Sequence, residues 1–70
     1  MTSYSTAGDL TPRMLDVIRA AAAGSSVKGT ALELGVSRAT IRTVRAAAFA
    51  RLDVHSMPAA IAEAYRRGAL

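Results

Sequence analysis

The chain has 70 residues, a formal net charge of +4 and no cysteine, so we expect one small domain without disulfide bonds or thiolate metal sites. One histidine and five scattered carboxylates offer no pair with the spacing of an acid–base or metal site. We therefore expect a chain that acts by binding, with no enzymatic activity, metal, cofactor or small-molecule ligand.

Composition favours an all-α fold, because sixteen residues are alanine, which forms helices without losing side-chain entropy. Residues 1–9 are small and polar and predict a flexible N-terminal tail, and residues 10–70 predict the folded domain. Thr11 as capping residue and Pro12 at the first helical position predict a helix from Pro12 to about Ala23. Its apolar stripe comprises Met14, Val17, Ile18 and Ala21.

Two further helices are expected on either side of a three-residue turn. Ser26 predicts the start of a short helix from Val27 to Leu34, and Ser37 predicts the start of a longer helix from Arg38 to Leu52. Gly35 tolerates the positive φ that the turn between them requires. The residues expected to face the core are Ala31, Leu34, Val36, Ile41, Val44, Ala48 and Leu52.

A fourth helix is expected to begin at Ser56 or Met57 and to reach about Arg67. The residues expected to pack inward from it are Ala60, Ile61 and Ala64. Arg66 and Arg67 lie in its last turn, where cations interact favourably with the helix dipole. His55 precedes this helix and is interpreted as a loop residue, because a solitary histidine does not make a metal site.

The positive charge is concentrated in one segment. Residues 28–51 carry five cations against one carboxylate and hold the whole net charge, whereas residues 1–27 and 52–70 each sum to zero. A basic block between neutral flanks suits a polyanionic partner. Eight of the nine cations are arginine, whose planar fork suits phosphates and guanine edges. The alternative interpretation is a solvated helical face without a partner.

Residues 27–52 have the dimensions of a helix-turn-helix: a short helix, a glycine-containing turn and a longer basic helix. The motifs around it are LTPR at 10–13, GSS at 24–26, Lys28, ALELGVS at 31–37, TIR at 40–42, and Arg51-Leu52 followed by Val54 and Ser56. On these motifs, residues 10–70 resemble the DNA-binding domain of LuxR-type transcriptional regulators, in particular the free-standing GerE-type members. The resemblance implies four helices, of which the third enters the DNA major groove.

The resemblance also implies roles for individual residues. Lys28 matches a position that commonly binds phosphate, and Ser37 and Thr40 match polar positions that hold the DNA backbone. Arg42 matches the basic position most often aimed at bases, and Thr43 matches its neighbour in the groove.

Four more residues complete the expected DNA-binding set. Ser26 and Lys28 form a candidate phosphate clamp at a helix N-terminus, although Ser26 also serves as a cap. Arg38 lies at the start of the recognition helix and is expected to contact phosphate. Arg45 lies at the edge of the apolar stripe, so it either extends over the core or contacts phosphate. Ala46 stands where some family members place a groove-facing cation.

The sequence also departs from the family pattern. Family members usually have Glu where this chain has Met14, and Glu-Ile where it has Gly29-Thr30, so two capping boxes lose their carboxylate. Four alanines occupy the outer side of the recognition helix: Ala39, Ala46, Ala47 and Ala50. Base readout therefore rests on Arg42, Thr43 and contacts between alanine methyl groups and thymine, which predicts modest specificity.

The leading hypothesis is a transcriptional regulator that binds double-stranded DNA as a homodimer. The resemblance implies a two-fold dimer through the C-terminal helix, where apolar atoms are expected to remain exposed. The residues expected there are Met57, Pro58, Ala59, Ala62 and Tyr65. Such a dimer would present two recognition helices one DNA turn apart, roughly 34 Å.

A second hypothesis is an interaction protein that binds RNA polymerase or another regulator, because residues 37–52 are also similar to region four of sigma factors. That similarity is weaker, since the chain continues into another helix. A membrane-surface peptide has less support, because the basic helix lacks Trp and Lys. The longest uncharged stretch, 54–62, is too short to span a membrane and the N-terminus has no export signal, so we expect a cytoplasmic, nucleoid-associated protein.

Overall fold

The structure is a computed structural model, and residues 10–70 are described here. These residues form four helices and no strand, which confirms the all-α fold. The helices are α1 (Pro12–Ala22), α2 (Val27–Leu34), α3 (Arg38–Leu52) and α4 (Met57–Arg66). The predicted N-terminal tail, residues 1–9, lies outside the described residues.

Each helix begins at a hydroxyl residue whose side chain accepts a hydrogen bond from a backbone N–H of the first turn. The acceptors are Thr11, Ser26, Ser37 and Ser56, and the donor nitrogens belong to Met14, Gly29, Thr40 and Ala59 at 3.2, 3.0, 3.0 and 3.3 Å. Each bond satisfies one of the donors that a helix start leaves without an intrahelical partner. Serine and threonine therefore set all four starts, as the sequence predicted for α1, α2 and α3.

The ends of two helices differ slightly from the prediction. α1 ends at Ala22 and α4 at Arg66, so the predicted ends at Ala23 and Arg67 were each one residue too long. Both following residues act as caps, and their N–H groups still bond to carbonyl oxygens of the preceding turn. Such frayed last turns are the usual reason why helix boundaries vary by a residue.

Among the described residues, four have positive φ, and two of these, Gly35 and Asp53, are the C-caps of helices. Gly35 ends α2 with φ 71°, a conformation that costs glycine nothing. Asp53 ends α3 in the same conformation with φ 57°, and it is the non-glycine residue with positive φ in the described chain. The N–H of Val54 then donates to the carbonyl of Phe49 at 3.0 Å, which closes the end of α3.

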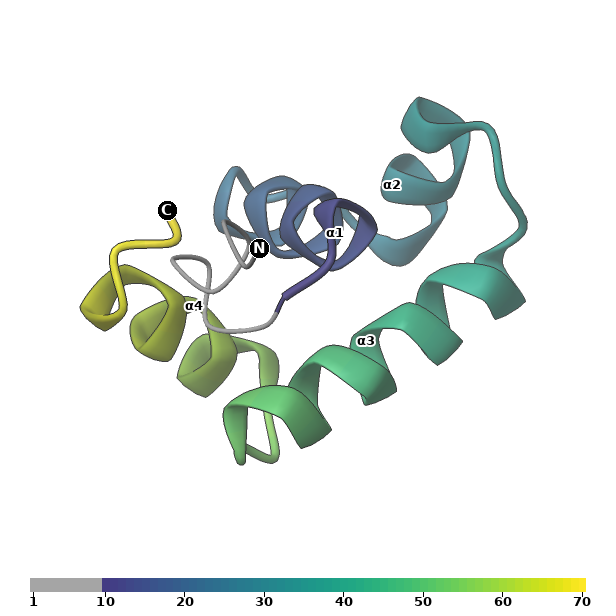
Figure 1. Cartoon of the computed structure of the whole chain (residues 1–70). Helices are drawn as coiled ribbons and strands as arrows, with labels where there is room; N and C mark the ends of the chain where they lie inside the picture. The colour runs from purple at the N-terminus through teal and green to yellow at the C-terminus, as the bar shows by residue number, and fades with distance from the viewer. Residues whose placement is uncertain (1–9) are drawn as a thin grey trace.

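α1 lies at the centre of the molecule, with α2 and α4 on opposite sides of it, and α3 runs beneath α1 and α2 toward the start of α4 (Figure 1). Two clusters of buried residues hold this arrangement together. The first comprises Leu10, Met14, Ile18, Ala48, Leu52, Ala60 and Ala64, and the second comprises Val17, Ala31 and Ile41. Val44 and Met57 pack against both clusters and join them.

The core contains three residues that the sequence did not place there: Leu10, Ala20 and Thr30. Ala20 is buried, whereas its neighbour Ala21, which was expected inside, is half-buried. Thr30 is only 3 % exposed, and its hydroxyl donates to the carbonyl of Ser26 at 2.8 Å. That bond satisfies a buried polar group that would otherwise be costly. Besides Ala21, four residues expected in the core are half-buried: Leu34, Val36, Val44 and Ile61.

No helix within residues 10–70 is both long and apolar enough to cross a membrane.

Candidate nucleic-acid interface

The helix-turn-helix unit, residues 27–52, consists of α2, the Gly35–Ser37 turn and α3. Leu34 and Val36 pack against the second core cluster from either side of Gly35. The N–H of Val36 donates to the carbonyl of Ala31 at 3.0 Å, which fixes the direction in which the chain leaves α2. Apolar anchors and backbone bonds thus hold α3 at a set angle to α2.

The outer face of α3 is the side opposite the core, and its exposed residues are Ala39, Arg42, Thr43, Ala46 and Ala50. At 100° per residue the three alanines and Thr43 follow the middle of this face, and Arg38 and Arg42 stand on one flank. The hydroxyl of Thr43 donates to the carbonyl of Ala39 at 3.1 Å. The middle of the face therefore presents mainly methyl groups, and the guanidinium groups lie beside it.

The N-terminus of α3 is built from two hydroxyl groups. The Ser37 hydroxyl accepts from the N–H of Thr40 and donates to the Thr40 hydroxyl, both at 3.0 Å. Both residues are exposed, at the end of the helix where the backbone dipole is positive. An anion approaching this end would meet hydroxyl groups, a helix terminus and the guanidinium of Arg38.

The N-terminus of α2 repeats this pattern. The Ser26 hydroxyl accepts from the N–H of Gly29 at 3.0 Å, and its carbonyl accepts from both the N–H and the hydroxyl of Thr30. Lys28 is exposed in the first turn, next to this cap. The structure thus places Ser26 and Lys28 together at a helix start.

Three cations of the helix-turn-helix unit stand on its exposed surface. Lys28, Arg38 and Arg42 form no ion pair with residues 10–70. Glu33, the carboxylate of this segment, instead lines a shallow depression shared with Asp16 on α1. The positive potential of the unit is therefore not neutralised at the side where Arg38 and Arg42 stand.

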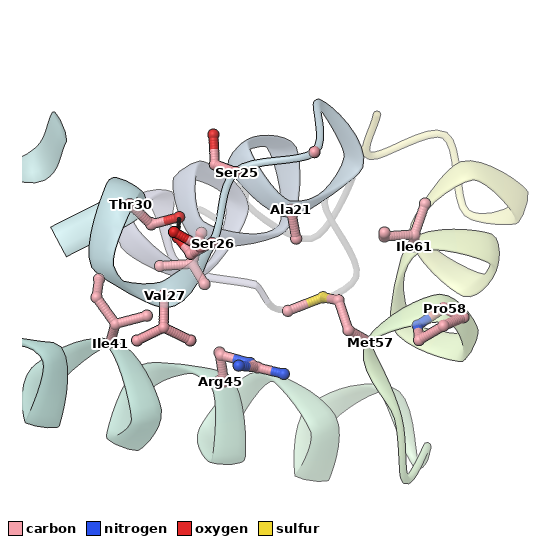
Figure 2. A pocket seen from close by; sticks show the side chains of 12 residues that line it. Ala21, Ser25, Ser26, Val27, Thr30, Ile41, Arg45, Met57, Pro58 and Ile61 are labelled. Carbon is pink, nitrogen blue, oxygen red and sulfur yellow. Dashed lines mark hydrogen bonds between the residues drawn. The ribbon is translucent and has the colours of Figure 1, made fainter. Parts of the chain in front are cut away.

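Arg45 lies apart from the outer face, on a groove of about 370 Å³ between α3, the α1–α2 loop and α4 (Figure 2). Its guanidinium carbon is 5.8 Å from the centroid of the Phe49 ring, within range of a cation–π contact. Apolar side chains, among them Val27, Ile41, Met57 and Ile61, line much of the groove. Arg45 is half-buried, with its side chain at the edge of the core, and its contact with a phosphate stays a prediction.

The surface of α4 is mixed. Pro58, Ala62 and Tyr65 are exposed, with Tyr65 at 61 %. Ala59 is half-buried, and Met57 packs against both core clusters. Exposed apolar atoms on α4 therefore come mainly from Pro58, Ala62 and Tyr65.

The C-terminal turn of α4 holds an ion-pair cluster. Glu63 accepts hydrogen bonds from Arg66 through both carboxylate oxygens and from Nε of Arg67 at 2.7 Å. Hydrogen bonds from Arg66, and then from Arg67, lower the pKa of Glu63 from 4.5 to about 2, and the same contact raises the pKa of Arg66. These two arginines are committed to a contact within their own helix.

One surface feature near the outer face was not predicted. Ala46 and Ala50 line a shallow depression together with His55, Asp53, Phe49 and Val54. Sequence reasoning treated His55 only as a loop residue, and no periodicity links it to the helix before it. Within residues 10–70, the structure shows no group of histidine or carboxylate side chains that could hold a metal ion.

Comparison with protein families gives one match, to the GerE model, described as bacterial regulatory proteins of the LuxR family, over residues 9–64. No curated protein and no solved structure matches the chain significantly. The matched segment includes the whole helix-turn-helix unit and most of α4. Helix-turn-helix domains of this family are DNA-binding domains of transcription regulators. The chain therefore belongs to the LuxR family of bacterial regulatory proteins.

Proposed function

We propose that the chain regulates transcription as a homodimer that binds double-stranded DNA with a sequence preference, each protomer inserting α3 into the major groove. The observation that carries this proposal is that Lys28, Arg38 and Arg42 form no ion pair with a described carboxylate. Because release of counterions from DNA drives such association, cations without an internal partner are available to phosphates.

One group of residues contacts DNA phosphates and a second group contacts base edges. Phosphate contacts come from the two helix starts and the cations beside them: Ser26, Lys28, Ser37, Arg38 and Thr40. Arg42 reads a base edge, because an arginine fork fits the O6 and N7 atoms of guanine. Thr43 and Ala46, in the middle of the outer face, lie against base edges, where alanine fits the thymine methyl. Arg45 reaches a phosphate only from the rim of its groove.

The dimer forms through α4. Pro58, Ala62 and Tyr65 supply the exposed apolar atoms, and Met57 and Ala59 support them from the half-buried side. Because the face is small, the dimer is weak in solution, and DNA strengthens it by mass action.

Titration of a fluorescent duplex at several salt concentrations tests the proposal. If each protomer neutralises three or four phosphates, the log–log slope of the association constant against salt is roughly −5 to −7 for a dimer. Substituting Lys28→Gln reduces the magnitude of this slope by about 0.9 per protomer. The matched variant Arg66→Gln keeps the parental slope, because that arginine is paired with Glu63. A flat salt response would contradict DNA binding.

The groove in Figure 2 favours a second candidate function, contact with another protein such as RNA polymerase. Its apolar lining and the Arg45 guanidinium suit an apolar segment that carries a carboxylate. Leu32, 75 % exposed on α2, adds a second apolar contact point. Retention of the chain by purified RNA polymerase, lost in the Arg45→Glu variant and combined with a flat salt response on DNA, would support this function instead.

A further inference from the structure

His55 lies in a turn, but the residues on both sides of it are anchored to the helices. It follows α3 by three residues and directly precedes Ser56, which caps α4. On its other side, Val54 packs against the first core cluster and donates a backbone hydrogen bond to Phe49 at 3.0 Å. Because both neighbours are anchored, the exposed His55 side chain is held close to the end of α3.

His55 also lies on the side of α3 that faces DNA in the proposed function. It lines the same shallow depression as Ala46 and Ala50 of the outer face. α3 has 15 residues and is about 22 Å long, whereas the major groove is about 12 Å wide. When the N-terminal half of α3 lies in the groove, its C-terminal end reaches the sugar–phosphate wall, and His55 stands there.

The charges around His55 make its protonation state important. Asp53 lines the same depression, and its carboxylate opposes an approaching phosphate. Arg51 is exposed on the last turn of α3. From α4, the first turn offers only uncharged residues, and the nearest carboxylate, Glu63, is paired with Arg66 and Arg67. An imidazolium at His55 offsets the repulsion between the Asp53 carboxylate and a phosphate, and it supplies a hydrogen-bond donor to that phosphate.

We infer that His55 is a DNA-contacting residue whose imidazolium binds a backbone phosphate beside the C-terminal end of α3, so that DNA affinity rises as the pH falls below neutrality. The inference rests on the proposed function. The relevant ligand is a phosphodiester, so the contact strengthens binding to any duplex sequence. It adds to the phosphate contacts at the two helix starts and lies at the opposite end of the recognition helix.

The composition of the chain makes this inference directly testable. His55 is the one histidine in the sequence, and histidine is the side chain that ordinarily changes charge between pH 5 and 8. Above pH 5.5 carboxylates are ordinarily ionised, and lysine and arginine stay protonated well above pH 7. A change in DNA affinity between pH 5.5 and 7.0 therefore reports on His55.

The experiment measures fluorescence anisotropy of a labelled 30-base-pair duplex of random sequence at pH 5.5 and 7.0. Wild type is expected to bind roughly 3–10-fold more tightly at pH 5.5, with a salt slope larger by about 0.9 per protomer, as one added phosphate contact requires. His55→Gln is expected to bind equally at both pH values, at the wild-type level of pH 7.0. His55→Lys is expected to bind tightly at both.

Each outcome supports or overturns the inference. The exposed position of His55 keeps all three proteins folded, which circular dichroism at both pH values checks. Equal pH dependence in wild type and His55→Gln would assign the response to another group and overturn the inference. A wild type that binds DNA with a steep salt slope but no pH dependence would also overturn it, and would leave the proposed function standing. A flat salt response would overturn both.

Discussion

The helix-turn-helix unit and α4 use the same residue type in opposite ways. In the unit, Arg38 and Arg42 have no carboxylate partner among the described residues, whereas on α4 both Arg66 and Arg67 bond to Glu63. Net charge follows the same division, because residues 28–51 carry all of it. An arginine paired within its own helix is of little use to an outside anion. The difference teaches that availability of the cations, rather than their number, distinguishes the side on which we propose that DNA binds.

The largest expected effect on DNA binding comes from removing cations of the helix-turn-helix unit, compared with removing one from α4. Arg42→Ala should cost about 1–3 kcal/mol at one base position in each half-site, because a base-reading fork is lost. Lys28→Ala should instead weaken binding to all sequences alike. Arg66→Ala, the matched change on α4, should leave DNA affinity unchanged.

Selection of bound fragments from random duplexes, followed by titration of the selected and of random sequences, measures both effects. If Arg42→Ala and Lys28→Ala changed the two kinds of duplex identically, the division between base reader and phosphate contact would be wrong. If Arg66→Ala weakened binding as much as Arg42→Ala, the comparison between the two regions would fail.

A smaller effect should follow from a charge placed on α4. Ala62 is exposed, and a residue close to a two-fold axis meets its own copy across the interface. Ala62→Glu and Ala62→Lys should therefore both abolish cooperative binding to a palindromic site, by repulsion between like charges. Affinity for a single half-site should change little in the first variant and rise in the second. Cooperativity retained in both, seen in titrations of full and half sites, would place dimerisation elsewhere.

The smallest effect concerns the ion pairs of α4 in acid. The pKa of Glu63 is lowered from 4.5 to about 2, so its pairs stabilise the fold fully above pH 4.5 and this stabilisation is lost as the pH falls toward 2. Thermal unfolding of wild type should therefore shift to lower temperature between pH 5 and pH 2.5. Glu63→Gln should show a smaller shift. Glu33→Gln, which removes a carboxylate without an ion pair among the described residues, should behave as wild type, and an equal shift in all three would contradict the role of Glu63.

Much of the fold could be predicted, because the local signals are strong. Ser26 and Ser37 stand directly before apolar patterns of helical period, and α2 and α3 have the predicted bounds. Burial was harder to predict among small residues. The helical wheel places Ala21 within the apolar stripe and Ala20 beside it, yet Ala20 is the buried one, because packing against other helices decides burial at the edge of a stripe. Thr30 is buried because a backbone carbonyl one turn away accepts its hydroxyl, which hydropathy alone does not indicate.

The sequence could predict the positions of candidate site residues that lie along one helix. It could not predict positions that depend on how separate segments of the chain pack together. Positions such as Arg42 and Thr43 follow from helical period and from the family motif. Arg45 could not be assigned, because its position depends on the groove that α3 forms with the α1–α2 loop and α4. His55 was correctly predicted to lie in a loop, but its place beside Ala46 and Ala50 was not predictable, because the turn at Asp53 that brings it there has no periodic signal.

Val44 and Met57 pack against both core clusters, and this shared packing has a geometric consequence for any dimer built through α4. This packing holds α3 and α4 at a fixed orientation, so the helix proposed to contact DNA and the helix proposed to form the dimer move together. In a dimer of two such protomers, the distance and the angle between the two α3 helices are fixed. Because B-DNA turns once in about 10–10.5 base pairs, a single inserted base pair rotates one half-site by roughly 35° relative to the other. A rigid protomer has no internal motion with which to absorb that rotation, so the operators of this regulator should share one half-site spacing.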